Sequence, residues 1–136
     1  MVEINNTTKE RVDARAVKKA AEIFLEKKRK SGYEVSVAFV GDAAIRKLNK
    51  AYRGMDKATD ILTFAGEDKF LGEIIIDYRQ IKRQAKEQGH SAKKELIFIL
   101  IHGLFHLLGY EDDAEKDRLH MIKIGQKFID RNLQEI

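Results

Sequence analysis

The chain has no cysteine, and this excludes both a disulfide framework and a metal site built on thiolates. No apolar run approaches the roughly 18 residues that are needed to cross a bilayer. The N-terminal segment also lacks the apolar core and the cleavage site of a secretory signal. These absences predict a cytoplasmic protein without a membrane partner.

The composition is that of a globular protein, with 136 residues of which 43% are hydrophobic and 35% charged. We expect a single domain over residues 1–136, long enough to bury one core. The net charge is +4, and basic residues concentrate in the first helical segment, at 46–53 and at 79–94. This distribution fits solvated helix faces with i,i+4 ion pairs, and it also fits a surface that attracts nucleic acid. Charge alone does not separate the two interpretations.

Hydrophobic periodicity predicts four strands, at residues 2–6, 35–40, 60–64 and 71–76. It also predicts five helices, each with its expected cap or bounds: 8–30 with Thr8 as N-cap, a helix capped by Asp42 that runs through Tyr52, one capped by Asp77 that runs to 88, 93–108 capped by Ser91, and 114–133. Strands grouped before the last three helices indicate an α+β fold with a small mixed sheet, in which one crossover could be parallel. The helix at 93–108 is apolar nearly all round, which is typical of a central core helix.

The segment that indicates chemistry runs from His102 to Asp112. At i and i+4 on a helix, His102 and His106 lie on one face, one turn apart, where two imidazoles can bind one metal ion. Gly109 then suits the end of the helix, because that position often has a positive φ. A chain reversal there would bring Asp112 back as the third ligand. Three protein ligands leave one coordination position for water, as in catalytic metal sites.

Other interpretations of these residues stay open. A histidine on an apolar helix is usually a core residue, and Asp112 with Glu115 also fits a capping box for the last helix. Asp113 or Glu111 could replace Asp112 as the third ligand. The residue after His102 is Gly103, whereas metalloproteases with an HExxH motif carry a glutamate there as general base. This difference disfavours peptide hydrolysis and favours a phosphodiester substrate.

The run from His102 to Tyr110, HGLFHLLGY, resembles the signature of the YbeY family. Further matches follow in the family's order between about residues 36 and 121: LN and YR at 48–53, Asp56, TDIL at 59–62, LGEI at 71–74, and QGHS at 88–91 before Glu95-Leu96. The resemblance implies a zincin-like α+β fold. It also implies a single-strand-specific endoribonuclease that acts in ribosomal RNA maturation and ribosome quality control with a bound metal ion, usually zinc.

Carried over by position, the resemblance places two metal ligands at His102 and His106 and a functionally important arginine at Arg53. The chain departs from the family's pattern at three positions: Asp112 stands for the third histidine, Glu111 for the preceding aspartate, and Ala58 for a proline. Aspartate still completes a three-ligand site, but its harder oxygen should weaken the acidification of water and could shift preference away from zinc.

Three functional hypotheses result. In the first, the protein is an endoribonuclease with one divalent metal ion, expected to be Zn²⁺, on His102, His106 and Asp112, while Arg53 holds the phosphate of single-stranded ribosomal RNA. In the second, it is a non-catalytic ribosome assembly factor whose metal is structural. Both imply the ribosome or ribosome-associated proteins as partners. A metalloprotease is a third, weaker hypothesis because of Gly103. Without the resemblance, an arginine at a helix end such as Arg53 more often only pairs with a carboxylate such as Asp56 or Asp60.

Overall fold

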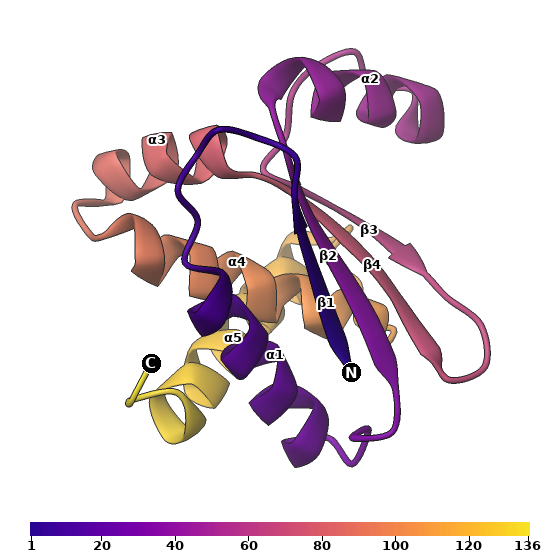
Figure 1. Cartoon of the computed structure of the whole chain (residues 1–136), viewed down its shortest axis with the longest axis vertical. Helices are drawn as coiled ribbons and strands as arrows, with labels where there is room; N and C mark the ends of the chain where they lie inside the picture. Colours follow the sequence, from indigo (N-terminus) through magenta and orange to yellow (C-terminus); the bar gives the residue numbers. More distant parts are fainter.

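A four-stranded sheet packed against five helices forms the structure, a computed structural model that describes residues 1–136 (Figure 1). The strands are β1 Val2–Asn6, β2 Glu34–Val40, β3 Ile61–Ala65 and β4 Phe70–Asp77. The helices are α1 Ala14–Lys27, α2 Asp42–Arg53, α3 Tyr78–Gln88, α4 Ala92–Leu107 and α5 Glu115–Asn132. The α+β class predicted from the sequence is confirmed.

The sheet has the order β1-β2-β4-β3 and is mixed. β1 pairs with β2 and β2 with β4 in parallel, whereas β3 pairs with β4 antiparallel. There are therefore two parallel pairings, one more than the sequence suggested. The short connection from β3 to β4 forms a hairpin, and β3, the last strand in the sheet order, lies at an edge of the sheet.

The main core lies between one face of the sheet and the helices α1, α3, α4 and α5. Alternate residues of β2 enter this core, namely Val35, Val37 and Phe39, as the two-residue period of a strand requires. A second, small cluster of Ile45, Leu62 and Ile75 holds α2 on the sheet. Figure 1 shows α4 crossing the sheet, with α1 and α5 close to it and α2 set apart.

Helix α4 confirms the predicted central helix. The Ser91 side chain accepts a hydrogen bond from the Lys94 N–H at 3.1 Å and caps its N-terminus. Ten of its residues are buried, because α4 packs against both the sheet and the helices around it. This burial fixes the helix that carries His102 and His106.

The beginning predicted for the first helix was wrong. Thr8 takes part in a local turn, in which its N–H and hydroxyl donate to the Asn6 side chain and its hydroxyl accepts from the Glu10 N–H. Asp13 caps α1 instead, accepting from the Ala16 N–H at 3.0 Å. The helix also ends at Lys27 rather than at residue 30. Short polar side chains compete in this way with helix formation through local hydrogen bonds.

Two other predicted caps had different outcomes. Asp77 caps α3, as predicted, by accepting from the Arg79 and Gln80 N–H groups. The N-cap of α2 is Gly41, so the prediction of Asp42 was wrong. Asp42 is the first residue of that helix and pairs instead with Arg83. None of the helices has the length and apolar character needed to cross a membrane.

Candidate metal centre

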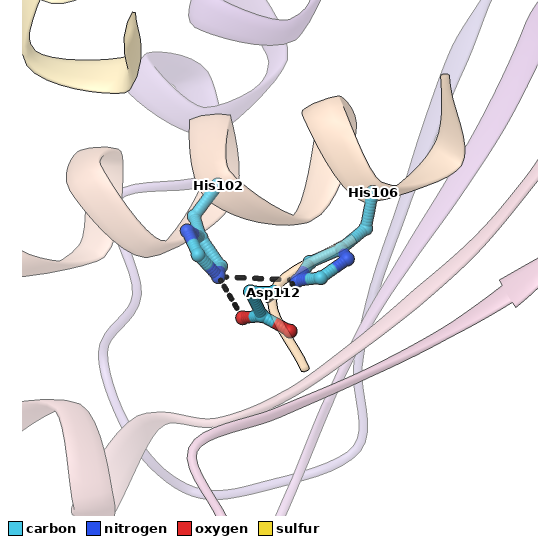
Figure 2. A group of neighbouring side chains, drawn as sticks. All are labelled: His102, His106 and Asp112. Atoms are coloured by element: carbon cyan, nitrogen blue, oxygen red, sulfur yellow. Dashed lines mark hydrogen bonds and ion pairs between the residues drawn. The ribbon is translucent and has the colours of Figure 1, made fainter. Parts of the chain in front are cut away.

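Three side chains converge at the C-terminal half of α4. The Nε2 atoms of His102 and His106 are 3.2 Å apart, and each lies 3.2 Å from Oδ2 of Asp112. Figure 2 shows the two imidazoles on neighbouring turns of the helix with the carboxylate facing both. The structure thus brings together the three residues that the sequence indicated as ligands.

The backbone after α4 explains how Asp112 reaches the histidines. Gly109 has a φ of 99°, which L side chains rarely adopt, and it ends the helix with its N–H bonded to the His106 carbonyl. The Tyr110 N–H then bonds back to the Phe105 carbonyl at 3.2 Å. This tight reversal returns the chain along the face of α4 that carries both imidazoles.

Protons alone satisfy this arrangement poorly. A neutral imidazole has one N–H, and if both Nε2 atoms donated to Asp112, no hydrogen would lie between the two nitrogens, which are 3.2 Å apart. A cation would satisfy all three atoms at once. Ligand atoms around a tetrahedral ion at roughly 2.0–2.1 Å lie about 3.3–3.4 Å apart, close to the observed separations. The donor set therefore fits a divalent metal ion and could hold one.

The electrostatics of His102 also suit a ligand. Burial lowers the pKa of His102 below its usual value, and the neighbouring His106 lowers it further, while Asp112 acts in the opposite direction. A histidine with a lowered pKa is neutral at physiological pH. Its lone pair is then available to a metal ion without displacement of a proton.

The segment before α5 shows which of the roles left open for Asp112 and its neighbours is realised. Ala114 is the N-cap of α5 and no side chain bonds there, so the capping box of Asp112 with Glu115 was wrong. Glu111 and Asp113 both line the cleft in front of the histidines, but only Asp112 belongs to the group of converging donors.

A cleft of about 760 Å³ opens over the three residues. One wall comes from α2 and β3 and the opposite wall from α4, α5 and the segment between them. Its lining includes Tyr52, Arg53, Thr59, Asp60, Ile61, Thr63, Phe64, His102, His106, Asp112 and Arg118. An extended ligand lying in this cleft would reach the three donors.

Arg53 lies in this lining, at the last residue of α2. It forms no ion pair, because the Asp56 carboxylate pairs with Arg46 at 2.8 Å and Asp60 bonds to Gln84 and Thr59. The pairing of Arg53 with Asp56 or Asp60, which the sequence left open, is absent. Its guanidinium is therefore free to bind an anion.

Gly103 lies on the side of α4 that packs against β3. A Cβ atom there would come within 2.6 Å of the Ile61 side chain and within 3.4 Å of Ile74 and Thr63. The position therefore has little space for a larger side chain. This packing gives a structural reason for glycine where HExxH proteins have glutamate.

Sequence reasoning missed a polar chain behind the site. The buried Glu95 carboxylate accepts from Gln84 at 3.1 Å and lies 2.6 Å from His90 Nε2, and Gln84 also donates to Asp60. Asp60 is close enough to His102 to act on its pKa. The available signal was Glu95 in an apolar helix shortly after His90. Periodicity did not show that Gln84 of α3 links Glu95 to Asp60.

A family model described as Endoribonuclease YbeY matches residues 3–132. A Finegoldia magna protein named Endoribonuclease YbeY is 45% identical over 95 residues, which cover 65% of this chain and 62% of that protein. A Roseiflexus protein of the same name is 37% identical over 115 residues, covering 75% of this chain and 72% of that protein. The chain thus spans about three-fifths of the first of these relatives.

A Thermotoga maritima protein of known solution structure has a similar fold. The similarity covers 96% of this chain and 87% of that protein, with a TM-score of 0.68 and 29% sequence identity. The fold and the sequence resemblance therefore agree over almost the whole chain.

Proposed function

The chain belongs to the YbeY family, and from this membership we propose that it is a metal-dependent endoribonuclease that cleaves single-stranded ribosomal RNA. We propose roles in the maturation of the 3′ end of the small-subunit RNA and in ribosome quality control. The observation that carries the proposal is the convergence of two imidazoles and one carboxylate in a cleft lined by a free arginine.

We assign the metal to His102, His106 and Asp112, with Zn²⁺ as the proposed ion. When bound, such an ion supplies a Lewis acid for a phosphoryl oxygen and lowers the pKa of a bound water. The chain's own contribution is to orient the two imidazoles on buried α4 and to hold the carboxylate against them by the turn at Gly109. The burial that lowers the pKa of His102 keeps its ring neutral.

Arg53 is the proposed phosphate-binding residue. Its guanidinium would bind the scissile phosphate bidentately and stabilise the charge that develops on its oxygens. The ion pair between Arg46 and Asp56 supports this role, because it occupies the Asp56 carboxylate and leaves Arg53 for the substrate.

One feature favours a second candidate function. Asp112 stands where the family resemblance places a histidine, and a carboxylate would lower the positive charge of the site. A weaker site fits a ribosome assembly factor that binds RNA and metal without cleavage. In either case the proposed partners are ribosomal RNA and the ribosome or its associated proteins, in the cytoplasm.

Metal content and RNA cleavage, measured on the same preparations, test the proposal. Wild type and the double variant His102→Ala with His106→Ala would be analysed by inductively coupled plasma mass spectrometry and incubated with single-stranded RNA. His120→Ala is a matched control, because His120 is exposed on α5. We expect near-stoichiometric metal and cleavage in wild type and the control, and loss of both in the double variant.

Other results separate the alternatives. Metal without cleavage under any divalent ion would favour the assembly factor. Cleavage of a peptide library would revive the protease. Wild type without metal, even after reconstitution, would refute the proposed site.

A further inference from the structure

A second hollow, of about 310 Å³, lies between the end of α1, the end of α4 and the last turns of α5. Four basic side chains line it: Lys27 at the end of α1, Lys28 directly after it, and Lys127 and Arg131 from α5. The metal centre uses none of them. No carboxylate lines the hollow.

The four cations have no counter-ion within the protein. None of them forms an ion pair within 4.0 Å, although ten such pairs occur elsewhere in the molecule. The dipole of α1 favours Lys27 and Lys28 at its C-terminal end, but Lys127 precedes the last turn of α5. The concentration of unmatched positive charge therefore attracts an anion.

Aromatic rings complete the hollow. Lys28 Nζ lies 5.1 Å from the centroid of the Phe105 ring and 5.8 Å from that of Phe128, so these rings hold the cation in place. Tyr110 contacts Phe105 edge-on at 5.2 Å and is 40% exposed. An exposed ring beside several cations is the combination on which single-stranded nucleic acids stack a base and place a phosphate.

The hollow and the metal cleft lie on different sides of the C-terminal end of α4 and the turn that follows it. On α4, His106 faces the cleft and the adjacent Phe105 faces the hollow. Beyond Gly109, Tyr110 lines the hollow, while Asp112 lies in the cleft. A flexible strand bound at the metal centre could therefore pass over this turn into the hollow.

We propose that this hollow is a second binding site for the RNA strand, in which Lys27, Lys28, Lys127 and Arg131 bind the phosphate of a nucleotide away from the scissile bond and Tyr110 stacks its base. The inference rests on the proposed endoribonuclease function and extends it from the metal cleft to the face formed by α1 and α5. In this proposal the second site binds the RNA strand and sets its register, and the metal cleft cleaves it.

A charge-neutralising double variant tests the assignment. Lys127→Gln with Arg131→Gln removes two cations that lie one turn apart on α5. Lys18→Gln with Lys19→Gln is the matched control, since both lysines lie on α1, form no ion pair and are outside the hollow. Fluorescence anisotropy with a labelled single-stranded RNA in EDTA measures binding without cleavage, over a range of salt concentrations.

The hollow variant should bind the RNA on the order of tenfold more weakly at about 0.1 M salt. Its log–log salt slope should become shallower by up to about 0.7, the value for the one phosphate that the hollow binds. The control should retain most of the wild-type affinity. Cleavage of a short oligonucleotide that fills only the metal cleft should be unchanged in both variants.

Each other outcome overturns a distinct statement. If the hollow variant binds RNA as tightly as wild type and the control do, while wild type cleaves RNA, the second site is refuted and the nuclease stands. If the hollow variant loses binding to an acidic peptide but not to RNA, the hollow is a protein site. If wild type binds RNA through the hollow without cleaving any, the proposed catalysis fails and the second site remains. If wild type neither binds nor cleaves RNA, both are refuted.

Discussion

Asp112 supplies the single oxygen atom among the three converging donors, beside two imidazole nitrogens. Carboxylates suit Mg²⁺ and Mn²⁺, whereas imidazole suits Zn²⁺. We therefore expect Asp112→His to raise the affinity for Zn²⁺ relative to Mn²⁺ on the order of tenfold. Competition titration against a metal-binding dye measures the two affinities.

Asp113→His is the control for this substitution, because Asp113 is exposed in the same segment but outside the converging group. It should leave the ratio of affinities unchanged. An equal shift in both variants would mean that any added histidine near the cleft recruits zinc, and that Asp112 is not the ligand.

Gly103 provides a second prediction for a single residue. Its missing Cβ leaves room for the Ile61 side chain, which an alanine would approach to 2.6 Å. Overpacking costs about 1–3 kcal/mol, and the better helix propensity of alanine returns about 1 kcal/mol. Only the Cδ1 end of the Ile61 side chain has to move, so the cost falls at the low end of this range. Gly103→Ala should therefore leave the free energy of unfolding close to that of wild type, within about 1 kcal/mol, as measured by urea denaturation.

Gly125→Ala is the matched control for that prediction. Gly125 lies in α5, and a Cβ there would meet no atom within 4 Å. Only the propensity gain remains, so the free energy of unfolding should rise by about 0.5–1 kcal/mol. An equal gain in stability from both substitutions would show that the contact with Ile61 has no cost.

At the scale of elements, the junction of β4 and α3 contains a buried carboxyl group, Asp77. Burial and the nearby Asp42 raise the pKa of Asp77 from 3.8 to about 6, while Arg83 lowers that of Asp42 to about 2. Between pH 3.8 and about 6 the folded protein holds a proton on Asp77 that the unfolded chain releases. This contribution to stability is therefore present below pH 3.8 and is lost as the pH rises to about 6.

We expect Asp77→Asn to remove that loss, because asparagine keeps the cap of α3 without a charge to bury. The free energy of unfolding at pH 7 should rise by at most about 3 kcal/mol, at about 1.4 kcal/mol per pKa unit. Urea titrations between pH 4 and 7 measure the difference between variant and wild type. A difference that stays constant over this range would contradict the raised pKa.

The elements themselves were predictable to different degrees. Helix α4 was predicted to within one residue at each end, because its apolar content and the Ser91 cap are local signals. The beginning of α1 was not, since Thr8 and Asp13 are both plausible caps and only the turn with Asn6 decides between them. The sheet order depends on pairings between distant segments, such as β1 with β2, which no local pattern specifies.

At the scale of the whole molecule, the site was more predictable than its surroundings. The spacing of His102 and His106 needed only a helix, and Gly109 marked the reversal towards Asp112. The sequence did not show that Arg53 lacks an ion pair, because this depends on Asp56 pairing with Arg46. The basic hollow joins the ends of α1 and α5, which only tertiary packing brings together.

Metal binding should also stabilise the whole fold, because the ion would tie the segment after Gly109 to the core helix α4. A ligand of the folded state at about 100 times its Kd contributes about 2.7 kcal/mol, which for this chain length corresponds to a Tm rise of roughly 10 °C. Calorimetry in EDTA and with added Zn²⁺ or Mn²⁺ measures the shift. The variant His102→Ala with His106→Ala should melt at the same temperature in both conditions. An equal metal-induced rise in that variant would place the stabilising ion elsewhere in the molecule, and no rise in wild type would argue against a metal centre at α4.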